Sequence, residues 1–143
     1  MIELSPYLIA VAAGWVVAQG AKYVIVVAKT RSLSHLRQLY LSGNMPSAHS
    51  ATTVALLTVV GLKDGIESGL FGVTALFASI VIYDSMMVRR SVGEQGLAIQ
   101  ELIKERLSEV ILPRAAKGHT PLEVLVGITV GVAVGAVVFF ATK

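Results

Sequence analysis

The chain contains no cysteine, few charged residues and few aromatic ones. Only 15% of its 143 residues are charged and 6% are aromatic, whereas a soluble globular domain carries about 25% charged residues. The absence of cysteine excludes a disulfide scaffold, a thiol nucleophile and a thiolate-ligated metal site. The basic residues are not interleaved with aromatic ones, so we expect no nucleic-acid partner. The chain has instead 55% hydrophobic residues, arranged in long blocks, which is typical of a membrane protein.

Four apolar segments predict membrane-spanning helices. They run over about 6–28, 45–62, 68–88 and 121–141, and each is close to the roughly 20 residues that cross the hydrocarbon of a bilayer. The first segment lacks the positive start of a signal peptide, so we expect it to be retained. The fold class is therefore predicted to be all-α. We expect one integral membrane domain over residues 1–143, a bundle of about four transmembrane helices.

The long segment between the third and fourth spans carries an amphipathic pattern. Apolar residues such as Ile99, Ile103 and Val110 recur at helical spacing, with charged residues opposite them, and this predicts a surface helix over about 94–112. Its mixed charge argues against binding to an anionic lipid surface. We expect it to pack against the rest of the protein or against a second copy.

The basic residues predict the orientation in the membrane. The two long connections, 29–44 and 89–118, fall on the same side because two crossings separate them. Ten of the twelve Lys and Arg residues lie on that side or at helix ends facing it, and only Lys63 and Lys143 lie on the other. The positive-inside rule then places both long connections in the cytoplasm and both termini on the opposite side of a bacterial-type plasma membrane.

The second span begins with a pattern that suits an anion. Pro46 is tolerated near a helix start, and Ser47 can cap the helix. The free N–H groups and the helix dipole of such a start attract an anion, and His49 would lie beside it. An ordinary capped helix with an interfacial histidine is the alternative.

A second pair opens the fourth span. His119 and Glu123 are four residues apart and share a helix face, and Pro121 fits the helix start. A carboxylate can hold an imidazole in one tautomer and leave its other nitrogen free to attack. A purely structural His–Glu contact is the alternative. A zinc site from His49, His119 and Glu123 is conceivable, but the nearby excess of Lys and Arg favours an anion.

Further charges are expected at the same membrane face. Arg89 and Arg90 could grip a phosphate, Lys22 could neutralise another oxygen, and Asp84 could orient an arginine. The alternatives are that the arginines anchor the chain by the positive-inside rule and that Lys22 extends to the interface.

Three separated segments resemble the divergent branch of the type 2 phosphatidic acid phosphatase superfamily, which is related to acid phosphatases and vanadium haloperoxidases. These segments, 42–51, 83–95 and 118–124, are collinear over nearly the whole chain. Pro-Ser-Ala-His at 46–49 resembles the superfamily's Pro-Ser-Gly-His, with alanine in the glycine place. Its last motif has a histidine followed four residues later by aspartate, and here glutamate follows His119 at that spacing.

The resemblance implies a metal-independent phosphatase without cofactor. It implies that His119 attacks phosphorus to form a phosphohistidine, that His49 protonates the leaving alkoxide and that Glu123 orients His119. Ser47 and a backbone N–H, expected at Ala48, would hold phosphate oxygens. The substrate would be a lipid phosphate, or an isoprenyl phosphate or diphosphate.

The sequence departs from the superfamily in three places. Arg-Pro is expected seven residues after Lys22, where the chain has Lys29 and threonine. The arginine expected six residues before the nucleophile is displaced to Arg89 or Arg90, with Arg114 as a weaker substitute. The usual core has six helices and this chain resembles the last four, so we expect a homodimer or higher homo-oligomer.

A stripe of glycines keeps two other functions open. Gly127, Gly131 and Gly135 lie four apart on one face of the fourth span, where another helix could approach closely. That helix could belong to the same chain or to a second copy. The rival functions are a non-catalytic oligomeric scaffold or pore, and an inactive binder of anionic lipid.

Overall fold

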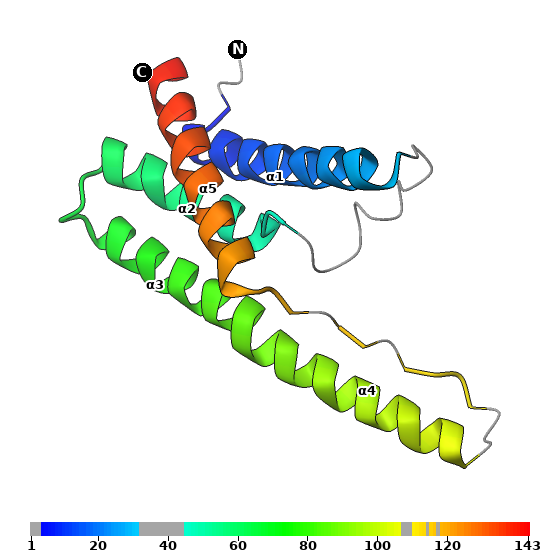
Figure 1. Ribbon diagram of the computed structural model, residues 1–143. Helices are drawn as coiled ribbons and strands as arrows, with labels where there is room; N and C mark the ends of the chain where they lie inside the picture. Colours follow the sequence, from blue (N-terminus) through cyan, green and yellow to red (C-terminus); the bar gives the residue numbers. More distant parts are fainter. Residues whose placement is uncertain (1–3, 32–44, 107–109, 114, 117) are drawn as a thin grey trace.

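The computed structural model describes residues 4–31, 45–106, 110–113, 115–116 and 118–143, and the described residues form helices without a strand. The elements in chain order are α1 (Pro6–Thr30), α2 (Ala48–Lys63), α3 (Gly69–Tyr83), the π-helix η2 (Asp84–Val88), α4 (Arg89–Glu105) and α5 (Pro121–Ala141). The predicted all-α membrane bundle is confirmed. The N- and C-terminal ends of the bundle lie near each other (Figure 1).

Three helical stretches are long and apolar enough to cross a membrane. They are α1, the continuous helix Gly69–Glu105 and α5. The second predicted segment forms a shorter helix, since α2 has 16 residues and is about 24 Å long at 1.5 Å per residue. Its start moves from 45 to Ala48 because Ser47 caps it.

The short helix α2 is the centre of the bundle. It packs against α1, α3 and α5, and small residues allow these close contacts. One buried cluster joins Ala10 of α1 to Ala55 of α2 and Val138 of α5, and another joins Ala18 to Ala51. At the end of the bundle near the termini, the Tyr7 hydroxyl of α1 donates a hydrogen bond to Asp64 at 2.7 Å.

The glycine stripe of α5 is buried against α2. A Cβ atom built on Gly127 would lie 2.6 Å from the Ser47 carbonyl oxygen, and one on Gly131 would lie 2.7 Å from that of Ala51. Gly135 meets Ala55 in the same way. The internal-packing alternative is therefore correct, and a scaffold or pore assembled through this stripe is not possible while α2 covers it.

The chain continues as a helix where the sequence predicted the start of a loop. The predicted third span ended at 88 and the amphipathic helix covered 94–112, but α3, η2 and α4 form one continuous helix to Glu105. No proline interrupts residues 84–105, so the helical register shifts through a π turn instead of breaking. The predicted end is also wrong, because residues 110–113 are not helical. Pro113 disfavours a helical conformation at the residue before it.

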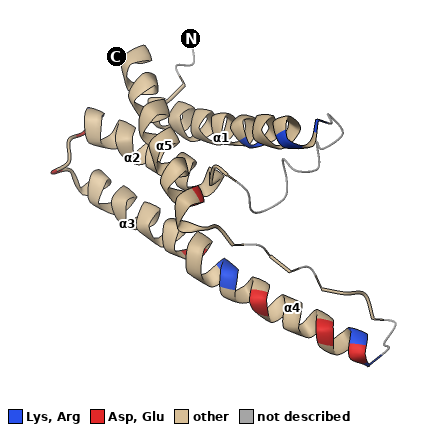
Figure 2. Cartoon of the chain, in the orientation of Figure 1, with Lys and Arg blue, Asp and Glu red and all other residues tan. Residues whose placement is uncertain are grey.

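The segment after α4 runs back along that helix (Figure 1). Glycines permit the approach, since a Cβ atom on Gly93 would collide with the Ala116 carbonyl oxygen and one on Gly96 would lie 3.1 Å from the Ala115 Cα atom. The Gln100 side chain donates to the Pro113 carbonyl oxygen at 2.6 Å. Figure 2 shows that α4 carries charged residues of both signs, whereas the bundle is nearly free of them.

The close contact of α5 with α2 predicts that a larger side chain at Gly131 destabilises the protein. Gly131→Ala inserts a methyl group against the α2 backbone, and overpacking of this kind costs about 1–3 kcal/mol. We expect a lower midpoint of thermal unfolding for the protein purified in detergent. Gly72→Ala is the matched control, because no atom lies within 4 Å of the added Cβ position. Equal midpoints for the two variants would contradict the observed packing.

Candidate functional site

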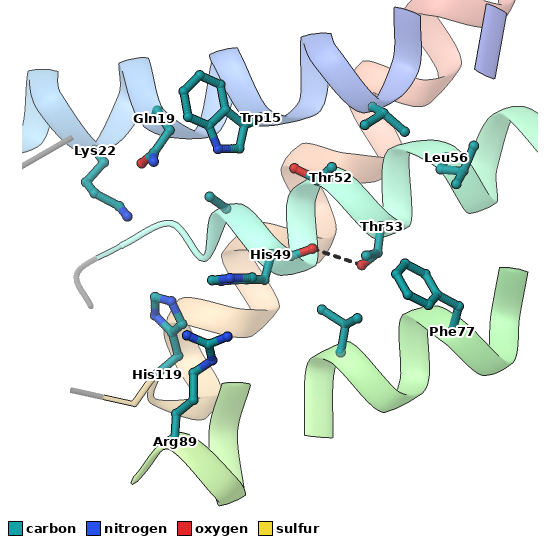
Figure 3. Close-up of a pocket in the computed structure, with 13 residues that line it drawn as sticks. Trp15, Gln19, Lys22, His49, Thr52, Thr53, Leu56, Phe77, Arg89 and His119 are labelled. Carbon is teal, nitrogen blue, oxygen red and sulfur yellow. Dashed lines mark hydrogen bonds between the residues drawn. The ribbon is translucent and has the colours of Figure 1, made fainter. Parts of the chain in front are cut away.

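A cleft of about 640 Å³ opens between α1 and α3, with α2 as its floor (Figure 3). Its lining residues come from α1, α2, α3, the start of α4 and the segment just before α5 (Pro121–Ala141). They are Val11, Trp15, Gln19, Lys22, Ala48, His49, Thr52, Thr53, Leu56, Phe77, Val81, Arg89 and His119. The charged residues and both histidines lie at one end, and the other end is apolar.

His119 is fixed by its backbone and by its ring. Its N–H donates to the Ser85 carbonyl oxygen at 2.9 Å, and its Nδ1 atom lies 3.0 Å from Glu123 Oε2. Glu123 also accepts from the Thr120 N–H and completes a capping box with the Thr120 hydroxyl. An Nδ1–H that donates to the carboxylate leaves Nε2 unprotonated in the neutral ring, so the free nitrogen is the one available to the cleft.

His49 faces His119 across the end of the cleft. Their ring centroids are 6.2 Å apart and their planes are inclined by 63°. His49 belongs to the first turn of α2, where the N–H groups of Ala48 and His49 have no partner within the helix. The Ser47 N–H donates to the Glu123 carbonyl oxygen at 3.0 Å, which ties the start of α2 to the first turn of α5. The two imidazoles are thereby held close enough to contact one anion.

Two cations complete this end of the cleft. Lys22 is only 3% exposed and extends from α1 toward His49 (Figure 3). Arg89 follows the π-helix, and its Nε donates to Asp84 at 2.8 Å. Asp84 thus orients an arginine as predicted. π-Helical turns are frequent at functional sites. The π-helix η2 places Asp84 and Arg89 one turn apart, so that their side chains can form this hydrogen bond.

The structure does not bring Arg90 into the cleft. Its Nε donates to Glu94 at 3.1 Å, and its side chain is 70% exposed. Successive helical residues are rotated by about 100°, so the side chains of Arg89 and Arg90 leave the helix in different directions, and only Arg89 lines the cleft. The expectation that Arg90 shares the site is corrected on this ground.

Ser47 and Lys29 also lie outside the cleft. The Ser47 side chain is fully buried and accepts hydrogen bonds from the N–H and hydroxyl of Ser50, so its oxygen is used in capping rather than presented to a ligand. Lys29 is exposed near the end of α1. Arg114, the weaker substitute for the displaced arginine, is outside the described residues.

Alanine fits in the place where the superfamily motif has glycine. Ala48 is buried and packs with Ala18 of α1 and Ala51 of α2, while it still lines the cleft. The extra methyl group is accommodated by these small neighbours, and the first turn of α2 keeps its place beside His119.

Comparisons with known proteins identify the family of the chain. A family model described as Divergent PAP2 family matches residues 4–134. The chain belongs to the Divergent PAP2 family. It is also 39% identical over 106 residues to the uncharacterized membrane protein YuiD of Bacillus subtilis (strain 168), a match that covers 64% of this chain and 67% of that protein. No solved structure matches the chain.

Several residues of this Divergent PAP2 family member line the cleft without having been predicted from the sequence. Trp15 and Gln19 precede Lys22 at helical spacing, and Thr52 follows His49 by three residues, so each shares a helix face with a predicted site residue. That spacing was the available signal. Ser85 gave none, because its role is a backbone carbonyl that accepts from His119.

The zinc alternative finds no support in the side-chain geometry. Within the described ranges, no three His, Asp or Glu side chains come close enough together to hold a metal ion. The Glu123 carboxylate is engaged by the Nδ1 atom of His119 and by the Thr120 N–H at the start of α5.

The different placement of the two arginines predicts different effects on anion binding. Arg89→Ala removes a cation from the cleft and should weaken binding of inorganic phosphate about tenfold or more, which is the range for a hydrogen bond to a charged group. Arg90→Ala removes an exposed side chain and should change the dissociation constant by less than about twofold. Titration calorimetry of the purified protein measures both. A larger loss for Arg90→Ala would contradict the assignment of Arg89.

Proposed function

We propose that this chain is a membrane lipid-phosphate phosphatase that works through a phosphohistidine intermediate. One observation carries the proposal: two imidazoles 6.2 Å apart, one of them bonded to a carboxylate, lie with Lys22 and Arg89 at the end of an apolar cleft. Phosphoryl transfer requires little from a protein beyond positioning and the neutralisation of charge. The membership in the Divergent PAP2 family supports the same chemistry.

In the proposed first step, the Nε2 lone pair of His119 attacks phosphorus and the bond from phosphorus to the lipid oxygen breaks. His49 enters the step protonated and transfers its proton to the leaving alkoxide, which departs as the lipid alcohol. Glu123 stabilises the positive charge that develops on His119. Lys22, Arg89 and the N–H groups of the first turn of α2 neutralise the phosphate oxygens.

In the second step, water attacks the phosphohistidine. His49, now neutral, accepts a proton from the water, the N–P bond breaks and inorganic phosphate leaves. His119 returns to its neutral form with Nδ1–H still donating to Glu123. Both steps use residues already in the cleft, and the reaction needs no added oxidant or reductant.

The apolar end of the cleft suits the tail of an amphiphilic substrate. The distance from Lys22 to Val11 along α1 is about 16 Å at 1.5 Å per residue, close to half of the ~30 Å hydrocarbon thickness of a bilayer. A lipid could therefore keep its chain in one leaflet while its phosphate lies between the imidazoles. The proposal places this end of the cleft on the cytoplasmic face, with the termini opposite, and keeps the expected homodimer or higher oligomer as a prediction.

The direct test is phosphate release from a panel of lipid and isoprenyl phosphates by the purified protein in EDTA. We expect release that survives chelation. His119→Asn should reduce it to background, and His49→Gln should lower it by about 10²–10⁴-fold, as for loss of a general acid. Glu123→Gln keeps a capping residue but loses the charge, and should lower the rate roughly 10–100-fold.

Other outcomes would favour the rival functions. No release from any lipid, together with retained binding of inorganic phosphate, would indicate an inactive binder of anionic lipid. Wild-type rates in His119→Asn would exclude His119 as the nucleophile.

A further inference from the structure

The π-helix η2 changes which backbone groups are paired where α3 continues into α4. In an unbroken α-helix each N–H donates to the carbonyl oxygen four residues earlier, so the N–H of Arg89 would donate to Ser85. It donates instead to the carbonyl oxygen of Asp84, five residues earlier. The Ser85 carbonyl oxygen is thereby released from the partner that an α-helix would give it.

The released carbonyl oxygen is bonded by the proposed nucleophile. The His119 N–H donates to Ser85 at 2.9 Å. Ser85 is fully buried, and its hydroxyl donates to the Ile82 carbonyl oxygen at 2.8 Å. The hydroxyl is therefore engaged within its own helix, whereas the carbonyl group contacts the segment before α5. This contact satisfies a buried carbonyl group that would otherwise be costly to leave unpaired.

The same turn places Arg89. Side chains five residues apart do not face each other in an α-helix, where the neighbours are three or four residues apart. The extra residue of the π turn brings Asp84 and Arg89 together, and the Arg89 Nε donates to the Asp84 carboxylate at 2.8 Å. Arg89 and His119 line the same end of the cleft (Figure 3). One local feature thus contacts both a cation and the nucleophile of the proposed reaction.

We infer that the π turn positions the proposed nucleophile, because its extra residue frees the Ser85 carbonyl oxygen to hold the His119 backbone beside Arg89. This inference rests on the proposed function and adds Ser85 to it as a positioning residue that acts through its backbone. Glu123 orients the ring of His119, and the bond to Ser85 ties its backbone to the helix that carries Arg89. A misplacement of about 1 Å can cost about 10²-fold in rate, so this bond should matter for turnover.

Removal of one residue from the turn separates its two effects. Met87 is the suitable residue, because its side chain is 55% exposed and it is not among the residues that line the cleft. Its deletion leaves Asp84 and Arg89 four residues apart, which keeps them neighbours on an α-helix. The N–H of Arg90 then stands four residues after Ser85 and takes the carbonyl oxygen that His119 uses. The flanking helices keep close to the same faces, since a π turn encloses one residue more than an α turn.

The test compares the wild-type protein with the Met87 deletion and with Met87→Ala, which changes the same side chain but keeps the length of the turn. In the deletion, hydrogen exchange of the His119 amide should become about tenfold faster or more, and kcat for a lipid phosphate should fall roughly 10–100-fold. The dissociation constant of inorganic phosphate should stay within about threefold, because Lys22 and Arg89 remain. Met87→Ala should match the wild-type protein in all three measurements.

The exchange measurement uses protein labelled with ¹⁵N at histidine. The chain has three histidines, and the signal that is lost in His119→Asn belongs to the amide of interest. This readout does not depend on activity, so it tests the hydrogen bond separately from the proposed function.

A second variant tests the same bond from the other side with the π turn intact. A Cβ atom on Gly118 would lie 2.8 Å from the Arg90 backbone nitrogen, so Gly118→Ala should push the chain before His119 away from α4. Faster exchange of the His119 amide and a lower kcat are expected here as well. Gly72→Ala, which adds a methyl group in open space, is the control. The inference is therefore testable even if the Met87 deletion does not fold.

The possible failures are distinguishable. Wild-type exchange of the His119 amide at the rate of an unbonded amide would overturn the inference and leave the proposed phosphatase in place. An unchanged kcat in a variant whose exchange has accelerated would do the same, and so would equal losses of kcat and of phosphate binding in both variants. Absence of phosphate release by the wild-type protein from every lipid phosphate would instead overturn the proposed function, whatever the exchange rates.

Discussion

The geometry of the cleft depends on the close approach of α5 to α2. Glycines at positions 127, 131 and 135 let the two backbones meet, and the Ser47 N–H donates directly to the Glu123 carbonyl oxygen. Lipid offers little hydrophobic drive for helices to associate, so close van der Waals packing and backbone contact are what hold such a pair together. Because both helices begin at this contact, their first turns are held side by side, and His119, just before α5, faces His49.

The rest of the site is arranged around that contact. The π turn after α3 presents Arg89 to the cleft and offers the Ser85 carbonyl oxygen to His119. The return segment approaches α4 closely at Gly93 and Gly118, which leads the chain back to the start of α5. α1 adds Lys22 from the other side, packed on α2 through Gly14. Among the described residues, the charged groups that line the cleft, Lys22 and Arg89, are therefore supplied by helices that pack against their neighbours.

Much of this could be predicted from the sequence. The lengths of the apolar segments and the capping residues at their starts predicted the helices. The start of α5 matches the prediction because Thr120, Pro121 and Glu123 together form a helix N-terminal cap. The predicted contact of His119 with Glu123 is present, but His119 precedes the helix and does not share a helix face with Glu123. The continuity of α3 with α4 was missed, since a π turn has no sequence signature and charged residues at 84–90 suggest a loop. The separation of Arg89 from Arg90 follows from the helical conformation of both residues, and the sequence analysis expected a loop there. Thr52 was missed although it lines the cleft and follows His49 by three residues on the same helix.

The central claim is that His119, held by Glu123, is the nucleophile that forms a covalent bond to phosphorus. The most direct measurement is rapid acid-free quenching of the protein during turnover of lipid phosphate labelled at phosphorus, followed by mapping of the labelled residue by mass spectrometry. The account predicts phosphorus on His119, with the label absent from His119→Asn. Label on His49, or turnover without any labelled histidine under conditions that preserve phosphohistidine, would contradict it.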